Sequence, residues 1–470
     1  MRSKPTAAIA AELSAWVIGA GSDSIPPQVR AFARLHMLDT LGCGLAAVGM
    51  DAAPAASRIA LAQGGAAEAS LLGESTCVPA ALAALANGTR CHGLDYDDTH
   101  EAGICHASAV VAPAALAIGE ARRSSGGDVL DAYLLGTEIT ARIAIRVAEG
   151  LYERGFHPTS VCGVFGATAA AARLLKLDAR TTTNALGIAG SFASGLFAYL
   201  EDGSATKPLH AGWAAQAGVQ AANLAAAGAT GPERVLEGRF GLMDAYTGDR
   251  SDPNSVCEGL GETWQLTDLS LKAFPACHFT HSSTWAAAEL AEEERLAPAE
   301  IDSITVRIPT AGVALVLDPL PAKREPKTPY DAKFSLPFTV AHRIVRGSLG
   351  LTAFAEEAIR DREVLALAAR VNAEPLPEPC PSRFGGGARI ETVDGRMLDR
   401  FVAHAPGSAQ NPLPEEWAFA KFRSNAELAL EPEHVSELLA TLQALEDAPS
   451  IAAAMAPVRG AAAIGLDHEA

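Results

Sequence analysis

Residues 301–308 read Ile-Asp-Ser-Ile-Thr-Val-Arg-Ile and mark a change of pattern along the chain. The second half of the stretch alternates apolar and polar side chains and is rich in β-branched residues, which predicts a strand. A second strand is predicted over 388–396, where an Asp-Gly pair indicates a tight turn, with 397–402 as its partner. Helical patterns lie before the first strand, at 281–294, and between the strands, at 331–346 and 361–371. We therefore expect a smaller α+β domain over residues 268–408.

Upstream of this region, the chain reads as one helix after another from residue 6 to about 265. Apolar residues recur every three or four positions over 29–42, and Pro26-Pro27 just before that run is typical of a helix start. Further helical runs follow at 79–86, 109–123, 127–149, 164–175, 181–200 and 209–227. Their many Ala and Gly residues permit close contact between helices, so we expect an all-helical domain over 1–267.

The end of the chain is again helical in pattern, with a helix expected from Pro432 to about residue 446. We expect 409–470 to form C-terminal helices that return to the helical domain. The run 385–387, three glycines, is interpreted as a loop, because the Lys-Ser/Thr of a phosphate-binding loop does not follow it. The predicted fold class is thus mainly α, a large all-helical domain plus a smaller α+β domain.

Composition narrows the class of function. The 470 residues are 49% apolar and 20% charged, which predicts two or three well-packed domains. The net charge of −18 disfavours nucleic acid as a partner, since phosphate binding needs a basic face. The eight cysteines form no CxxC pair and are expected to be reduced. Neither a signal peptide nor a membrane-spanning run is recognisable, so we expect a cytoplasmic protein with no membrane partner.

The densest group of titratable residues lies between His92 and His106, where four carboxylates and three imidazoles fall within fifteen residues. Each buried carboxylate must be paired or hydrogen-bonded, so such a group favours a functional site over a structural one. If the segment is helical, Asp95 and Thr99 share one face. A structural role as helix caps or ion-pair partners remains open for Asp97 and Asp98.

The same segment also fits a different chemistry. Asp97, Asp98 and Glu101 have the spacing of a DDxxE pattern on a helical background. In that alternative, the carboxylates bind Mg²⁺ and a prenyl diphosphate. A second metal-binding helix with suitable spacing is not visible in the sequence, and the α+β region has no role in that reading.

Three further elements contain candidate groups. Lys207 precedes a helix in an Ala-rich stretch, where it is an acid–base group, a fixed cation for a carboxylate or a solvated surface lysine. His278 and His281 are three residues apart, but a metal pair lacks a third ligand, and a proton shuttle is the better interpretation. His157 lies in a Gly/Pro loop before a helix, a position that is more often structural than functional.

Taken in order along the chain, several segments resemble the MmgE/PrpD family, which contains dehydratases, decarboxylases and epimerases. The matching segments are 87–99, His106, 155–160, 202–212, 274–281, 332–335 and 411–422. They extend over nearly the whole chain, and 95–99 is the most specific of them. The resemblance implies the two-domain fold predicted above and a homodimer.

The resemblance also implies a site without metal or organic cofactor. It implies the catalytic residues Asp95, His106, Lys207 and His281 and the substrate-binding residues Thr99, His157, His278 and Tyr330. The implied substrate is a small di- or tricarboxylic acid whose C–H bond next to a carboxylate is activated. Removing that proton needs a positioned base and positive charge near the developing enolate. Lys207 and His281 are the implied base and acid, and Asp95 orients Lys207 or His106.

The sequence departs from the family pattern after the 95–99 motif. No Trp follows Thr99, and Ala-Ser-Ala rather than Pro-Ser follows His106. The resemblance therefore predicts a lyase or isomerase and leaves dehydration, decarboxylation and epimerisation open. A family member that binds a carboxylate without turning it over is a further alternative.

Overall fold

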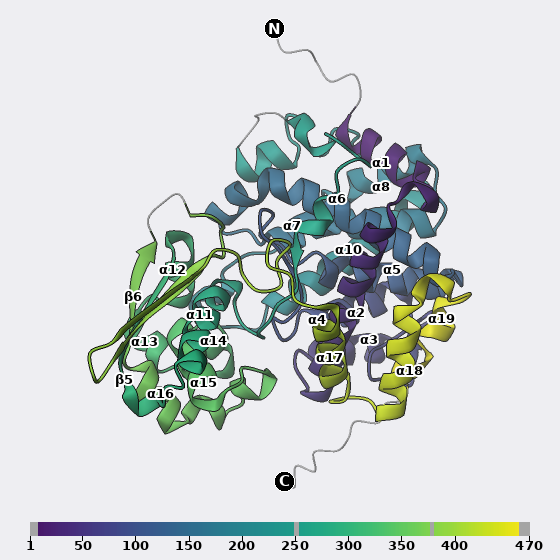
Figure 1. Ribbon diagram of the computed structural model, residues 1–470. Coiled ribbons are helices and arrows are strands. Elements are labelled where there is room, and N and C mark those ends of the chain that lie inside the picture. The colour runs from purple at the N-terminus through teal and green to yellow at the C-terminus, as the bar shows by residue number, and fades with distance from the viewer. Residues whose placement is uncertain (1–7, 249–252, 377–379, 460–470) are drawn as a thin grey trace. The chain divides into compact units, whose positions relative to one another are not determined.

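The computed structural model describes residues 8–248, 253–376 and 380–459. The first residues of the predicted helical domain, the last of the predicted C-terminal segment and two short internal stretches lie outside these ranges. The described chain divides into two units (Figure 1). We call the residues up to Leu269 together with those from Pro414 onward the helical unit, and Ser270–Leu413 the mixed unit.

Helices make up nearly all of the regular structure in the helical unit. Those before the mixed unit are α1 (Ile9–Gly19), α2 (Pro27–Gly49), α3 (Ala55–Gln63), α4 (Ala80–Cys91), α5 (Ser108–Arg122), α6 (Gly126–Glu153), α7 (Pro158–Leu174), α8 (Ala179–Ala189), α9 (Tyr199–Asp202) and α10 (Lys207–Ala226). Those after it are α17 (Glu415–Ala426), α18 (Pro432–Gln443) and α19 (Ile451–Ala454). Two short strands, β1 (Ala69–Ser70) and β2 (Cys77–Val78), pair antiparallel. Pro27 begins α2 as predicted, because its fixed φ suits the first turn of a helix.

Small residues set how closely the central helices pack. A Cβ on Gly212 of α10 would lie 2.1 Å from Thr89 Oγ1 and 2.2 Å from the Leu85 main-chain oxygen, both on α4. A Cβ on Gly88 of α4 would in turn lie 3.0 Å from the Gly212 Cα. Only glycine therefore allows α4 and α10 to cross at this distance. The crossing fixes the start of α10, at Lys207, relative to the segment that follows α4.

The C-terminal helices join the helical unit through α17, which packs against α2. Lys421 on α17 is buried, and its Nζ lies 2.9 Å from Asp39 Oδ1 on α2. The same ammonium donates to the main-chain oxygen of Tyr96 at 2.8 Å and lies 3.7 Å from the centre of the Tyr96 ring. Lys421 thus ties α17 and α2 to the 92–106 segment.

We predict that Lys421→Met destabilises the protein by about 3–5 kcal/mol, the usual cost of leaving one charge of a buried pair without its partner. Burial raises the pKa of Asp39 even with the ammonium beside it, so the ionised carboxyl group becomes still more costly once that ammonium is removed. Urea unfolding followed by circular dichroism measures the change. Arg58→Met, which breaks an exposed pair with Asp51, is the control and should cost less than about 1 kcal/mol.

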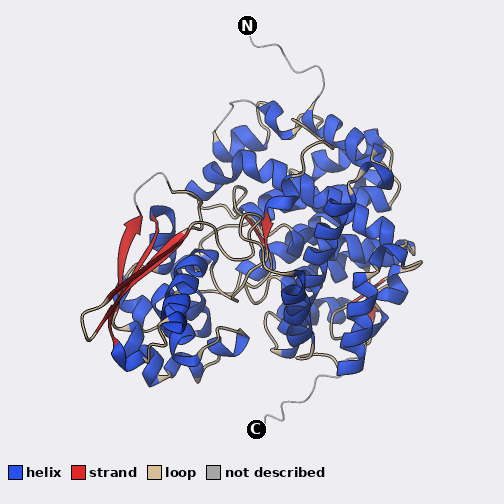
Figure 2. Cartoon of the chain, viewed as in Figure 1, coloured by secondary structure: helices blue, strands red, loops and turns tan. Residues whose placement is uncertain are grey.

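The mixed unit is built on a four-stranded sheet (Figure 2). Its strands are β5 (Ile301–Pro309), β6 (Val371–Leu376), β7 (Gly386–Thr392) and β8 (Met397–Val402), in the order β6-β5-β7-β8. β5 is parallel to β6 and antiparallel to β7, and β7 and β8 form the hairpin predicted from the Asp394-Gly395 turn. The helices of the unit are α11 (His281–Glu293), α12 (Thr310–Val316), α13 (Leu320–Arg324), α14 (Pro329–Lys333), α15 (Leu336–Arg346) and α16 (Arg362–Ala368). α11 packs against β7 and β8. The predicted fold class is confirmed.

Four local predictions are wrong. The helix expected over 331–346 is divided into α14 and α15, because Phe334 and Ser335 leave the helical conformation between them. The helix expected over 181–200 ends at Ala189, because the chain turns there and Gly195 takes a positive φ of 120°. The helix expected over 361–371 ends at Ala368, and Val371 begins the unpredicted strand β6. The glycine run 385–387 is only partly a loop, since Gly386 begins β7. None of the described helices is both long and apolar enough to cross a membrane.

Candidate active site

The 92–106 segment is not a helix. α4 ends at Cys91, and Asp95 then adopts a left-handed φ of 55° that interrupts any helical continuation. A two-residue strand, β3 (Thr99–His100), and a turn closed by a bridge between His100 and Cys105 complete the segment before α5. The helical face expected to be shared by Asp95 and Thr99 is therefore absent. The polar side chains of the segment bond to one another across its turns, as His92 does to Asp97, or to other elements, as Asp95 does to Lys207.

Lys207 and Asp95 form a buried ion pair. Lys207 begins α10 and is only 7% exposed, so the interpretation as a solvated surface lysine is wrong. Its Nζ lies 2.6 Å from Asp95 Oδ1, and Asp95 is 3% exposed. Asp95 thus contacts Lys207, one of the two groups that it was expected to orient. An ammonium beside a buried carboxylate is stabilised in its charged form.

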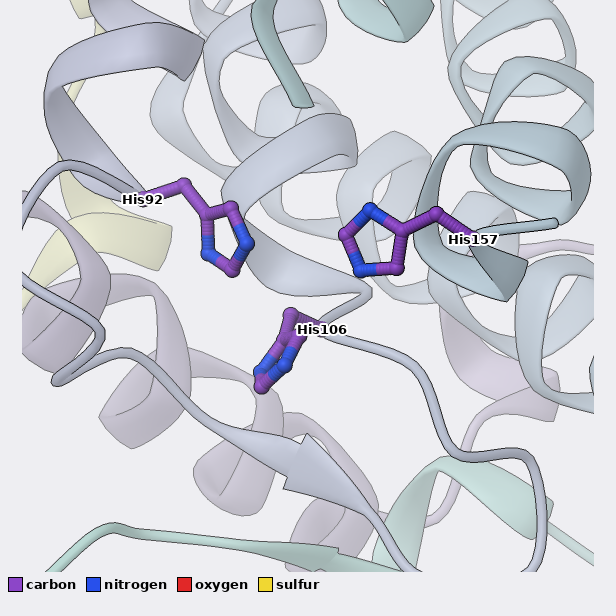
Figure 3. A group of neighbouring side chains, drawn as sticks. All are labelled: His92, His106 and His157. Atoms are coloured by element: carbon purple, nitrogen blue, oxygen red, sulfur yellow. The ribbon is translucent and has the colours of Figure 1, made fainter. Parts of the chain in front are cut away.

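Three imidazoles gather beside this pair, from three different elements (Figure 3). His92 directly follows α4, His106 precedes α5, and His157 is the N-cap residue of α7. The ring centres of His92 and His106 are 4.7 Å apart, and those of His92 and His157 are 5.9 Å apart. His106 Nδ1 lies 2.7 Å from the main-chain oxygen of Asp98 and 3.3 Å from Thr99 Oγ1. The structure therefore brings Asp95, Thr99, His106, His157 and Lys207 into one neighbourhood.

Two members of this group, His92 and His210, were given no individual role from the sequence. His92 Nδ1 lies 2.8 Å from Asp97 Oδ2, and both side chains are buried. His210, three residues after Lys207 on α10, has its Nδ1 3.0 Å from His157 Nδ1. The spacing of Lys207 and His210 on one helix was a usable signal, because residues three apart lie on the same face. The contact of His92 with Asp97 depends on the irregular turn between them and had no such signal.

Asp97, Asp98 and Glu101 do not form the acidic face required for a diphosphate-bound Mg²⁺. The Asp98 carboxylate binds His36 Nδ1 at 2.9 Å and accepts from the Ser108 hydroxyl, which makes it a structural group between α2 and α5. Asp97 is held by His92. Without a helix, the DDxxE spacing no longer places Glu101 beside Asp97. The prenyl diphosphate alternative is therefore wrong.

Burial and nearby positive groups control the charge of two imidazoles. Burial, helped by His92, Lys207 and His210, holds the pKa of His157 well below its ordinary value. Burial, helped by His92 and Lys207, lowers the pKa of His210 to about 4. Both rings are therefore neutral near pH 7. A neutral pair of imidazoles can share one proton between their Nδ1 atoms, with one ring donating and the other accepting.

His100 is a structural histidine whose bonds fix it in the neutral form. Its Nε2 donates to the main-chain oxygen of Gln265 at 2.9 Å, and its Nδ1 accepts from the Gly103 N–H at 3.0 Å. A second proton on Nδ1 would break the bond to Gly103. Burial lowers the pKa of His100 below its ordinary value, consistent with this geometry.

We predict that His100 makes the fold sensitive to acid. Below about pH 6.5 the unfolded chain protonates this ring while the folded chain keeps it neutral, so the free energy of unfolding falls as the pH falls. The loss is at most about 1.4 kcal/mol per pH unit for one group. Urea unfolding between pH 7 and pH 5 should show a shallower pH dependence for His100→Gln than for the wild type. Equal slopes would contradict the assignment.

The remaining predicted residues lie in the mixed unit. His281 begins α11, and its ring stacks on that of His278 with centres 4.7 Å apart. Tyr330 is on α14, which contacts the segment before His278 through a bond from Lys333 Nζ to the Pro275 main-chain oxygen at 3.0 Å. In the described part of the chain, the groups of three metal-ligating side chains lie elsewhere and do not include His278 or His281.

Comparison with known proteins decides the family. The model of the MmgE/PrpD N-terminal domain matches residues 11–254, and the model of the C-terminal domain matches residues 274–447. The chain belongs to the MmgE/PrpD family. It is 31% identical over 432 residues to human cis-aconitate decarboxylase, covering 87% of this chain and 86% of the human protein.

More distant family members cover almost the whole chain. The cis-aconitate decarboxylase-like protein oryM of Aspergillus oryzae is 26% identical over 477 residues, covering 97% of this chain and 98% of oryM. Cis-aconitate decarboxylase of Aspergillus terreus is 25% identical over 458 residues, covering 93% of each chain. The MmgE/PrpD resemblance predicted from the sequence motifs is confirmed, and these relatives support an enzyme of the lyase type.

Proposed function

We propose that this MmgE/PrpD protein is a lyase that acts on a small di- or tricarboxylic acid by moving a proton at the carbon next to a carboxylate. The buried Lys207–Asp95 pair, with three imidazoles beside it, is the observation that supports this proposal most strongly. Decarboxylation is the first candidate reaction, because the human and Aspergillus terreus relatives are named as cis-aconitate decarboxylases. Side chains alone can perform such a proton transfer, so the proposed reaction needs no cofactor.

Lys207 is proposed to supply fixed positive charge. A carbanion formed next to a carboxylate spreads its charge onto the carboxylate oxygens, and an ammonium held in place stabilises that charge without reorganisation. Asp95, 2.6 Å away, keeps the ammonium charged and fixes its position. This favours the role of Lys207 as a fixed cation, or as an acid that returns a proton, over a role as a base.

His106 is proposed to exchange the proton with the substrate. The Asp98 main-chain oxygen can only accept a hydrogen bond, so His106 Nδ1 carries the hydrogen and the lone pair is on Nε2. The ring is therefore oriented as a general base. His157 and Thr99 are proposed to bind substrate oxygens, since a neutral imidazole and a hydroxyl both donate hydrogen bonds to carboxylates.

In the mixed unit, His281 is proposed as a further acid or base, with His278 and Tyr330 as substrate-binding residues. His281 Nε2 lies 3.3 Å from the Ala276 main-chain oxygen, an acceptor that orients the ring. These roles rest on the family resemblance and on the local geometry of the 274–281 segment.

The substrate and the reaction can be assigned by one panel. The purified protein is incubated with di- and tricarboxylates, including cis-aconitate, and the products are read by ¹³C NMR. Released CO₂ indicates decarboxylation, a new double bond with loss of water indicates dehydration, and an inverted stereocentre indicates epimerisation. Binding of a carboxylate with no product in any assay would contradict the lyase and support the non-catalytic alternative.

A further inference from the structure

His92 has an arrangement that the proposed proton transfer does not use. Its Nδ1 faces Asp97, and its Nε2 is buried and has no hydrogen-bond partner among the described residues. An imidazole nitrogen in such a position costs free energy unless something binds it. Figure 3 shows the His92 ring across from His157, with His106 close to both. One nitrogen from each ring lies within 4.8 Å of the other two.

In each of the three rings, Nδ1 also bonds to a neighbouring group. His92 Nδ1 contacts the Asp97 carboxylate, His106 Nδ1 contacts the Asp98 main-chain oxygen, and His157 Nδ1 contacts His210. Metal-binding histidines typically have one ring nitrogen bonded to a carboxylate, a carbonyl or another polar group, which orients the second nitrogen toward the ion. All three rings have such a bond at Nδ1. Three histidines that are neighbours for unrelated structural reasons would not all need one.

The surrounding charge suits a divalent cation. Asp95 and Asp97 are buried beside the cluster, and a nitrogen of His106 lies within 4.8 Å of a carboxylate oxygen of each. Lys207 neutralises one of these two carboxylates. One negative charge therefore remains next to the three rings. Imidazole ligands select Zn²⁺, Co²⁺, Ni²⁺ or Cu²⁺ over Mg²⁺ and Ca²⁺, which prefer oxygen ligands.

We propose that His92, His106 and His157 bind one divalent transition-metal ion of the Zn²⁺ type, and that this ion inhibits the enzyme. The inhibitory part rests on the proposed function, because the ion would occupy the His106 and His157 rings assigned to the substrate. In a tetrahedral site with zinc–nitrogen bonds of about 2.0–2.1 Å, two ligand nitrogens lie about 3.4 Å apart. The three nitrogens lie within 4.8 Å of one another, so binding requires the rings to approach by at most about 1.4 Å.

The site can be tested without measuring activity. Full-length protein is treated with EDTA, desalted and titrated with Co²⁺, whose visible absorption reports nitrogen coordination, and Zn²⁺ binding is measured by equilibrium dialysis. We expect one ion per chain for either metal and no binding of Mg²⁺. His92→Gln, which removes a ligand, and Asp97→Asn, which removes the group behind it, should each weaken binding at least tenfold. His434→Gln, at an exposed position on α18, is the control and should bind as the wild type does.

The outcomes separate this site from the proposed function. Failure to bind one ion per chain, or equal affinity in the wild type and both variants, would overturn the metal site. If a substrate is turned over, activity should fall as the ion binds and return with EDTA. Unchanged activity at full occupancy would overturn the inhibitory role. Binding by a protein that turns over no carboxylate would support the metal site and contradict the lyase.

Discussion

Lys207→Met is expected to lower kcat/KM by at least about a hundredfold, and by up to about ten-thousandfold if Lys207 also returns the proton. The variant keeps the unbranched shape and most of the length of the side chain but removes its charge, so the developing carbanion loses the cation proposed to stabilise it. The loss should appear mainly in kcat, because the charge develops most fully in the transition state. Initial rates on the substrate found in the carboxylate panel give both constants.

The variant also leaves the Asp95 carboxylate without the Lys207 ammonium, so its folding must be checked separately. The double variant Asp95→Asn/Lys207→Met removes both charges and should fold at least as well as the single variant, because an unpaired buried charge is more costly than none. It should remain as inactive as Lys207→Met. Near-wild-type turnover in a folded Lys207→Met protein would remove Lys207 from the mechanism.

His106→Gln is expected to lower kcat by about a hundredfold or more, the lower range for loss of a general acid–base group. Glutamine can still donate a hydrogen bond to the Asp98 main-chain oxygen but has no group that takes up a proton near neutral pH. The segment should therefore stay in place while the chemistry is lost. Steady-state kinetics and circular dichroism, measured on the same preparation, separate these two effects.

The control for His106→Gln is His434→Gln, which replaces an exposed histidine in the same unit. That protein should keep its full turnover. A His106→Gln variant that raises KM and leaves kcat unchanged would indicate that His106 binds the substrate without exchanging its proton.

The elements predicted well from the sequence are those whose pattern is local. The alternation in 301–308 gave β5, and the Asp394-Gly395 pair gave the β7–β8 hairpin, because turn chemistry and side-chain alternation act over a few residues. The strand β6 was missed for the opposite reason. It holds Glu374 and Pro375, which read poorly as a strand, and it is fixed by parallel pairing with β5 about 70 residues earlier.

The candidate site was also predicted only in part: its residues were recognised, but their local conformation was not. The motif positions Asp95, Thr99, His106, His157 and Lys207 were recognisable by residue type and order, and they lie together in the helical unit. The local conformation was not predictable from the sequence. Asp97 bonds to His92 across a turn, and Asp98 bonds to His36 on α2. Such tertiary contacts override the helical spacing that made the 95–101 run look like an acidic face.

The most direct test of the proposed chemistry is proton NMR of the reaction in heavy water. The wild-type protein is predicted to incorporate solvent deuterium at the carbon next to a carboxylate of its substrate or product, and folded Lys207→Met and His106→Gln proteins are predicted to do so at least about a hundredfold more slowly. A product that carries no deuterium at that carbon, or incorporation at the wild-type rate in both variants, would contradict proton transfer by this cluster.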